Sequence, residues 1–231
     1  MEYLPNGYTL ELAPGTFPLS TDSMVLSHFV RLPAKARVLD LGSGCGTLGL
    51  LLCARDSGCH VTGIERDEAA HNGAVENIRR NGLTDRMESI CGDLRQQTKA
   101  LPAGSFTTCV SNPPYFSSGP AAQLTAARRE DHCTLEALIA SASRSLKYGG
   151  DFYLVHRPER LGEILYQAGR HQLEGKRLCL VRHKEGGPVC LILLQLRKGG
   201  KPGLLWEEWT LHHSDGTPTQ CYHDIYHTQE A

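Results

Sequence analysis

The distribution of hydrophobic residues divides the chain into short apolar runs and longer segments with helical spacing. Five apolar runs have the length of strands, at residues 37–41, 60–65, 87–91, 106–111 and 151–156. Four intervening segments are expected to be helices, at residues 47–55, 67–80, 134–147 and 158–169. Because continuous apolar strands that alternate with helices are typical of covered parallel sheets, the pattern predicts an open α/β fold with helices on both faces of the sheet.

The pattern changes in the last third of the chain. Residues 177–182 and 189–197 are two β-rich runs joined by Glu185-Gly186-Gly187-Pro188, which predicts an antiparallel hairpin at one side of the sheet. Before the first core strand, residues 8–12 favour an added strand and residues 22–31 favour a covering helix. We therefore expect a single domain of residues 37–231, preceded by an N-terminal extension of residues 1–36 that covers the site.

Composition narrows the class of protein further. The chain has 231 residues, of which 40% are hydrophobic and 21% are charged, so a mainly disordered chain is excluded. No run of eighteen apolar residues occurs, and the first residues lack the basic and apolar regions of a secretory signal. The nine cysteines include no Cys-x-x-Cys pair, and His212, His213, His223 and His227 follow no known zinc spacing. We expect a cytoplasmic protein without a membrane span or a metal site.

Charge is distributed unevenly although the formal net charge is only −1. Residues 170–201, here called the basic segment, hold eight Lys and Arg against two Glu, a net of +6. Residues 1–30 carry a net of −3 and residues 205–231 a net of −5. A local basic segment can bind phosphates when the total charge is neutral, but a solvated strand face explains the same residues.

A glycine-rich turn follows the first predicted strand, as Asp40-Leu41-Gly42-Ser43-Gly44-Cys45-Gly46. Glu65 ends the next strand, where a carboxylate accepts hydrogen bonds from two ribose hydroxyls in dinucleotide-binding folds. The turn alone is compatible with NAD or S-adenosylmethionine. Asp40 favours the second, because its charge would oppose a pyrophosphate but attract an ammonium and a sulfonium. A tight turn without a ligand is the structural alternative.

Two further segments end predicted strands and so belong to the same edge of the sheet. Asp93 can accept a hydrogen bond from an adenine amine, and it can equally cap a helix. In Asn112-Pro113-Pro114-Tyr115 the prolines hold the backbone extended. The Asn112 side-chain oxygen and a neighbouring backbone carbonyl can then accept both hydrogens of a planar amine and direct its lone pair at a methyl group.

Taken together, these motifs resemble those of class I S-adenosylmethionine-dependent amino-methyltransferases. The set is similar to the bacterial enzymes that methylate N6 of the adenine beside the anticodon of valine tRNA. Four less specific segments also match this family, namely residues 17–26, residues 127–130, residues 154–161 and Lys198-Gly199-Gly200. The resemblance implies a Rossmann-like fold, S-adenosylmethionine as cofactor and RNA, in particular tRNA, as partner.

The resemblance also implies roles for individual residues. Asp40, Gly42, Gly44 and Gly46 hold the methionine part of the cofactor, Glu65 the ribose and Asp93 the adenine. Asn112 and Pro113 hold the target amine, and Tyr115 stacks on its base. The alternatives are a protein glutamine N5-methyltransferase, another rRNA or DNA amino-methyltransferase, and a non-catalytic RNA-binding protein. A release-factor enzyme usually has an N-terminal helical domain, which residues 1–36 are too short to supply.

Overall fold

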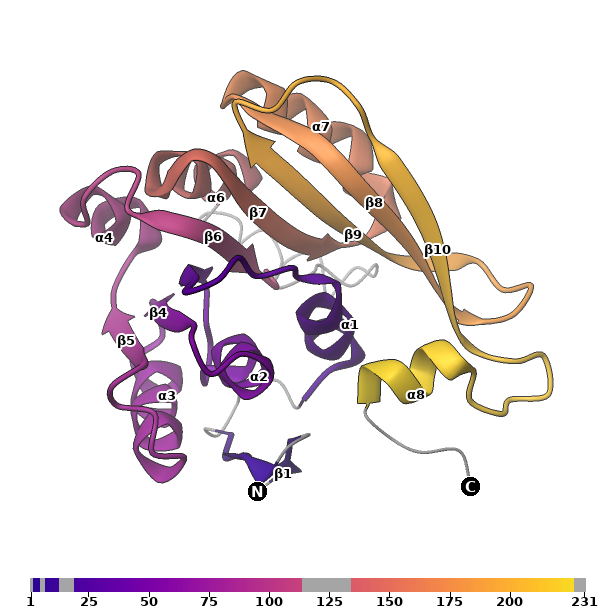
Figure 1. Cartoon of the computed structure of the whole chain (residues 1–231), viewed down its shortest axis with the longest axis horizontal. Helices are drawn as coiled ribbons and strands as arrows, with labels where there is room; N and C mark the ends of the chain where they lie inside the picture. Colours follow the sequence, from indigo (N-terminus) through magenta and orange to yellow (C-terminus); the bar gives the residue numbers. More distant parts are fainter. Residues whose placement is uncertain (1, 5–6, 13–18, 114–133, 227–231) are drawn as a thin grey trace, which may run out of the picture.

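The structure is a computed structural model that describes residues 2–4, 7–12, 19–113 and 134–226 (Figure 1). Its centre is an eight-stranded sheet with the strand order β10-β8-β9-β7-β6-β3-β4-β5. In chain order the strands are β3 (Arg37–Leu41), β4 (His60–Glu65), β5 (Met87–Cys91), β6 (Phe106–Ser111), β7 (Leu146–His156), β8 (Leu173–Lys184), β9 (Val189–Lys198) and β10 (Leu205–His212). The predicted α/β fold is confirmed.

Strand directions agree with the predicted mostly parallel sheet. Strands β5, β4, β3, β6 and β7 are joined by parallel pairings. Strand β9 is antiparallel to both β7 and β8, which confirms the hairpin predicted from residues 177–197. Because β10 is parallel to β8, the carboxyl ends of all strands except β9 lie at one edge of the sheet.

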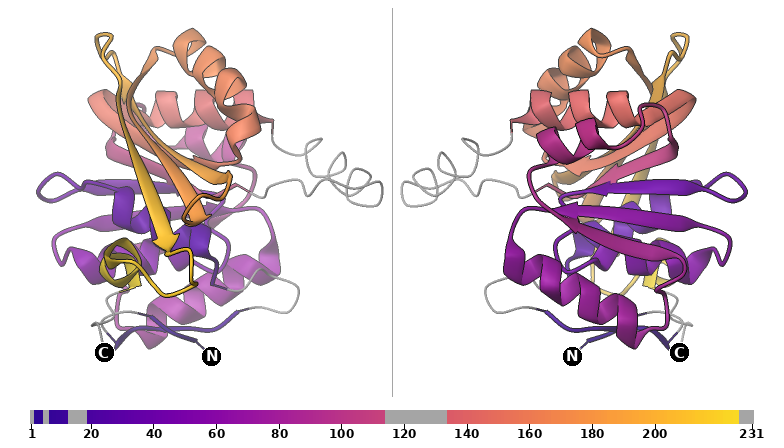
Figure 2. Two further views of the ribbon diagram at one scale, coloured as in Figure 1. Left: turned by 90° about the vertical axis from the view of Figure 1, so that its right-hand side faces the viewer. Right: turned by 90° about the vertical axis from the view of Figure 1, so that its left-hand side faces the viewer.

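Helices cover both faces of the sheet (Figure 2). One layer contains α1 (Thr21–Phe29), α2 (Thr47–Arg55), α3 (Glu68–Arg80) and α8 (Gln220–Tyr226), whose buried side chains share one hydrophobic cluster. The opposite layer contains α4 (Leu94–Ala100), α6 (Leu135–Ser145) and α7 (Leu161–Arg170), which pack in a second cluster. In the described part of the chain, no helix has the length and apolarity needed to cross a membrane.

Side-chain caps explain where several helices begin. Ser20, Asp67 and Thr134 precede α1, α3 and α6, and each accepts a hydrogen bond from a backbone N–H in the first turn. Such caps satisfy donors that a helix leaves unpaired at its N-terminus. Helix α7 instead begins after a short 3-10 turn, η2 (Pro158–Arg160), so the helix predicted from residue 158 starts three residues later.

The fifth core strand is longer than predicted. The sequence indicated a helix closed by Gly149-Gly150 and a strand over 151–156, whereas α6 ends at Ser145 and β7 begins at Leu146. The pairing of β7 with β6 is irregular between Phe106 and Thr108, and it accommodates the two glycines inside the strand. A glycine pair that looked like a helix stop therefore marks a strand irregularity.

Strand β10 and helices α4 and α8 were not predicted from the sequence. Strand β10 lies at the edge of the sheet beside β8, so only part of its surface is buried. Helices α4 and α8 have seven residues each, too few for a clear helical period. The acidic C-terminal region is therefore largely structured through residue 226.

The N-terminal strand predicted at residues 8–12 is short and separate from the main sheet. Strand β2 (Thr9–Leu10) pairs only with β1 (Glu2–Tyr3), in a two-stranded sheet of its own. Asn77 of α3 and Asn81, the C-cap of that helix, hold this region. Asn81 bonds the N–H and C=O of Thr9 at 2.9 and 2.8 Å, and Asn77 bonds those of Glu11 at 2.9 and 2.8 Å.

Candidate active site at the carboxyl ends of the central strands

The described site residues come from four adjacent parallel strands, in the order β6-β3-β4-β5. Asn112 directly follows β6, Asp40 is the last residue but one of β3, Glu65 ends β4, and Asp93 follows β5 by two residues. Because these strands are parallel neighbours, their carboxyl ends form one crevice. The structure thus brings the predicted residues to a single edge, with the exception of Tyr115, which lies outside the described residues.

The glycine turn has a backbone that only glycine adopts readily. Gly42, Gly44 and Gly46 have φ angles of 77°, 54° and 85°. The N–H groups of Gly42 and Ser43 donate to the Ile64 carbonyl of β4 at 2.9 and 3.1 Å, which fixes the turn against the next strand. A Cβ added to Gly42 or Gly44 meets nothing within 4 Å among the described residues, so open space adjoins the loop on that side.

Asp40 is the most unusual ionisable group of the site. It is 1% exposed, and neither carboxyl oxygen has a hydrogen-bond partner within the described part of the chain. Burial, followed by the nearby charge of Glu65, raises the pKa of this carboxyl to about 7 from the usual 3.8. A buried carboxyl without a partner is costly, so its presence suggests a cationic ligand that the folded chain does not itself provide.

Glu65 connects the glycine turn to the start of α3. Its Oε2 accepts from the Gly44 N–H at 2.8 Å, and its Oε1 accepts from the Asp67 N–H at 2.8 Å. A carboxylate has additional lone pairs beyond these two bonds. Glu65 therefore holds the loop in shape and retains the capacity to accept hydrogen bonds from ribose hydroxyls.

Asp93 caps a helix, which is one of the two roles that the sequence allowed for it. Its side chain caps α4 by accepting from the Arg95 N–H at 2.8 Å, and it also pairs with the Arg95 guanidinium. The bonds to Arg95 lower the pKa of Asp93, which keeps it ionised. The adenine contact remains a prediction, which the remaining lone pairs of the carboxylate allow.

Asn112 and Pro113 lie at the end of β6. The preceding Ser111 hydroxyl donates to the Leu41 carbonyl at 2.7 Å and ties the end of β6 to the end of β3. The Asn112 Nδ2 donates to the Ser23 hydroxyl of α1 at 3.0 Å. Pro114 and Tyr115, the remainder of the motif, lie outside the described residues.

Sequence reasoning missed Asn77, which touches both the N-terminal region and the glycine turn. It is 0% exposed, and its Nδ2 donates to the Cys45 carbonyl at 3.1 Å as well as to the Glu11 carbonyl. An asparagine on the inner face of an otherwise apolar helical pattern was the available signal. Asn77 joins residues 9–12 to the loop that carries Gly44 and Gly46.

Four of the eight cations of the basic segment form ion pairs with other residues that the structure describes. Arg177 pairs with Glu207, Arg182 with Glu208, Arg197 with Asp151 and Arg170 with Glu136. Lys198 donates to the Ser143 and Leu146 carbonyls at 2.6 and 2.8 Å, at the end of α6. The Lys198 side chain therefore stabilises a helix C-terminus, and contact of the basic segment with RNA stays a prediction.

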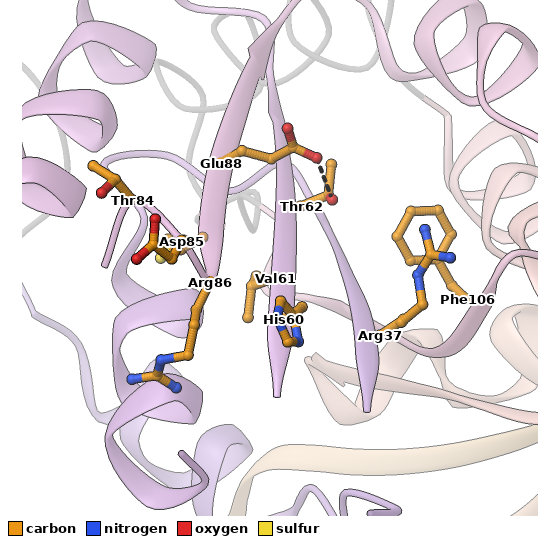
Figure 3. Close-up of a pocket in the computed structure, with 10 residues that line it drawn as sticks. Arg37, His60, Val61, Thr62, Thr84, Asp85, Arg86, Glu88 and Phe106 are labelled. Atoms are coloured by element: carbon orange, nitrogen blue, oxygen red, sulfur yellow. Dashed lines mark hydrogen bonds between the residues drawn. The ribbon is translucent and has the colours of Figure 1, made fainter. Parts of the chain in front are cut away.

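The structure also has a hollow that lies away from this site. A hollow of about 490 Å³ lies beside Arg37, His60 and Phe106, the first residues of β3, β4 and β6, and so at the opposite edge of the sheet (Figure 3). The described residues contain no group of three or more His, Cys, Asp or Glu that is suited to a metal ion. The eight cysteines of the described part are free thiols.

Comparisons with known proteins agree with this geometry. The model of the methyltransferase small domain family matches residues 19–168. Two relatives, each named tRNA1(Val) (adenine(37)-N6)-methyltransferase, are those of Photobacterium profundum and Porphyromonas gingivalis. The first is 30% identical over 77% of this chain and 76% of the relative, and the second 33% identical over 72% and 70%.

Solved structures give the same fold. A predicted O-methyltransferase from Agrobacterium tumefaciens superposes with a TM-score of 0.76 at 23% identity, covering 91% of this chain and 98% of that one. The precorrin-6y C5,15-methyltransferase of Geobacter metallireducens has a TM-score of 0.59 at 14% identity, covering 82% and 94%. With the glycine turn, Asp40 and Glu65 at one edge of this fold, the chain belongs to the methyltransferase small domain family and is a methyltransferase.

Proposed function

We propose that the protein transfers a methyl group from S-adenosylmethionine to N6 of adenine 37, the adenine beside the anticodon, in a valine tRNA. The relatives that cover most of the chain carry the name of this reaction. The observation that carries the proposal is the position of Asn112 and Pro113, on the strand next to the one that bears the buried carboxyl of Asp40.

The residues present fit the cofactor. The unpartnered carboxyl of Asp40 suits its ammonium group, Glu65 suits the ribose hydroxyls, and the open side of Gly42 and Gly44 leaves room beside the loop. Asp93 would face the adenine. When bound, S-adenosylmethionine supplies a methyl group activated by a positively charged sulfur.

The protein contributes position and polarity rather than a nucleophile. The Asn112 Oδ1 and the Pro113 backbone carbonyl accept the two N6 hydrogens of the adenine, which withdraws the nitrogen lone pair from the ring and aims it at the methyl group. Tyr115 stacks on the base once it leaves the anticodon loop. We also propose that the N-terminal extension of residues 1–36 covers the site, which the contacts of Ser23 with Asn112 and of Glu11 with Asn77 support. The reaction is expected to take place in the cytoplasm.

A methyl-transfer assay tests the proposal. The protein is incubated with labelled S-adenosylmethionine and either unmodified bacterial tRNA or total protein, followed by nucleoside and peptide mass spectrometry. We expect N6-methyladenosine at position 37 of valine tRNA and no label in protein. Methylglutamine in the protein fraction, or label in RNA at other positions only, would contradict it.

A further inference from the structure

Asn112 has a partner on a helix that precedes the core. Its Nδ2 donates to the Ser23 hydroxyl at 3.0 Å, although the two residues are 89 positions apart in the sequence. Ser23 is 6% exposed, so this hydroxyl lies in the wall of the crevice and is largely shielded from water. The contact ties the site residue of β6 to the first turn of α1.

Ser23 is held in place by its own surroundings. Its N–H donates to the capping hydroxyl of Ser20 at 3.4 Å, at the start of the helix. Its neighbours Met24 and Val25 are buried at 2% and 0% exposure in the hydrophobic cluster shared with α2. Because packed side chains fix the helix, the Ser23 hydroxyl has a defined position relative to the end of β6.

The two ends of an asparagine side chain have opposite hydrogen-bonding roles, since the NH2 donates and the oxygen accepts. A target amine presents donors, so only the oxygen of Asn112 can receive it. With its NH2 engaged by Ser23, the planar amide directs its oxygen to another side. A flipped amide would place its NH2 against the amine of the substrate, donor against donor.

We propose that Ser23 is a positioning residue, which holds the Asn112 side chain in the productive position by accepting from its NH2. This inference rests on the proposed function and adds to it a residue outside the Asn-Pro motif. Ser23 acts through Asn112, so it lowers the barrier to methyl transfer without holding the cofactor.

The experiment compares Ser23→Ala with Ser23→Thr, which keeps the hydroxyl, and with Ser27→Ala as a matched control. Ser27 lies one turn further along α1, is 4% exposed, and donates to the Met24 carbonyl rather than contacting Asn112. For each variant, kcat and KM are measured on tRNA, the Kd for S-adenosylmethionine by calorimetry, and Tm by thermal unfolding.

We expect Ser23→Ala to lower kcat about 10-fold, as for the loss of one oriented hydrogen bond, with KM and Kd changed less than about twofold. Ser23→Thr and Ser27→Ala should keep most of the wild-type kcat. Ser23→Ala combined with Asn112→Ala should be no slower than Asn112→Ala alone, because the two residues act as one unit. Additive losses, or equal losses in Ser23→Ala and Ser27→Ala, would overturn the proposal.

A spectroscopic readout separates this inference from the proposed function. The side-chain amide signal of Asn112 in a 15N spectrum is identified by its disappearance in Asn112→Ala. Ser23→Ala should shift this signal and Ser27→Ala should not, whatever the substrate is. If the wild type leaves tRNA unmethylated while the signal responds as expected, the proposed substrate fails and the Ser23 contact stands; an unmoved signal refutes the contact itself.

Discussion

The buried carboxyl group of Asp40 makes the stability of the free protein depend on pH. Its usual pKa is 3.8, but burial first and the Glu65 charge second raise it to about 7 in the folded chain. Between these two values the unfolded chain is ionised while the folded one holds its proton. The free energy of unfolding therefore falls as the pH rises from about 4 to about 7, by roughly 1.4 kcal/mol per unit of pKa difference.

Asp40→Asn should consequently stabilise the free protein, and more at pH 8 than at pH 5. The full effect is on the order of 4 kcal/mol, because the variant no longer has to retain a proton or bury a charge. Thermal unfolding at both pH values measures it, with the exposed Asp85→Asn as control. The same variant should bind S-adenosylmethionine much more weakly by calorimetry; a Tm gain independent of pH would contradict the assignment.

Asn112 is expected to illustrate the opposite case, a residue needed for the reaction but not for cofactor affinity. Asn112→Ala should lower kcat by about 100-fold or more, because an oriented acceptor of the amine is lost. The Kd for S-adenosylmethionine should change little, since Asp40 and Glu65 remain. Single-turnover methylation and calorimetry on the same preparation provide the comparison, and turnover equal to the wild type would remove Asn112 from the mechanism.

Helix α3 and the N-terminal segment match in geometry. Asn77 and Asn81 are four residues apart on a helix, about 6 Å along its axis, and they bond Thr9 and Glu11, two residues apart in an extended chain, about 6.6 Å. Each asparagine satisfies one backbone N–H and one C=O. Because these two distances agree, the helix can bind the N-terminal segment at two points.

Asn77→Ala should cost more than Asn81→Ala, because Asn77 also holds the Cys45 carbonyl of the glycine turn. Removing the fully buried amide leaves several backbone groups without this partner, so we expect a loss of roughly 2–4 kcal/mol in the free energy of unfolding. Denaturant unfolding measures the loss. Asn77→Ala should also weaken S-adenosylmethionine binding, whereas Asn81→Ala serves as the control that loosens the segment but leaves the turn intact.

At the level of the whole molecule, sheet topology decides which cations can reach the substrate. Lys184 ends β8 and lies at the same edge as Asn112, whereas Lys201 follows the reversed strand β9 and lies at the opposite edge. Both lysines are exposed and belong to the basic segment. Within the described residues, neither side chain forms an ion pair of its own. Of these two lysines, only Lys184 is therefore expected to contact an RNA whose adenine binds at this edge of the sheet.

Lys184→Glu should weaken tRNA binding severalfold and make its salt dependence shallower, since fewer counterions are released. Lys201→Glu makes the same charge change at the other edge and should leave tRNA affinity nearly unaltered. Filter binding at two salt concentrations distinguishes the pair. Equal effects of the two variants would mean that net charge, rather than position, governs RNA binding.

Local patterns were sufficient for most of the fold. The apolar runs at 37–41, 60–65 and 106–111 became strands with the predicted bounds, because buried parallel strands have a distinctive composition. The predicted end of the helix before Gly149-Gly150 was wrong, because a glycine pair is typical both of a helix end and of a strand irregularity. Strand β10 was missed because its stability comes from pairing with β8, which its own residues do not indicate.

The sequence by itself determined the family and located the candidate site residues, because the glycine turn, Asp40, Glu65, Asp93 and Asn112 each lie at or just after the end of a strand in a recognisable local motif. Tertiary structure decided which residues of distant segments contact one another. It placed Ser23 against Asn112 and Asn77 against Cys45, and it paired three cations of the basic segment with Asp151, Glu207 and Glu208. The physical reason is that a motif depends on neighbours along the chain, whereas hydrogen bonds and charge pairs depend on distances that only folding sets.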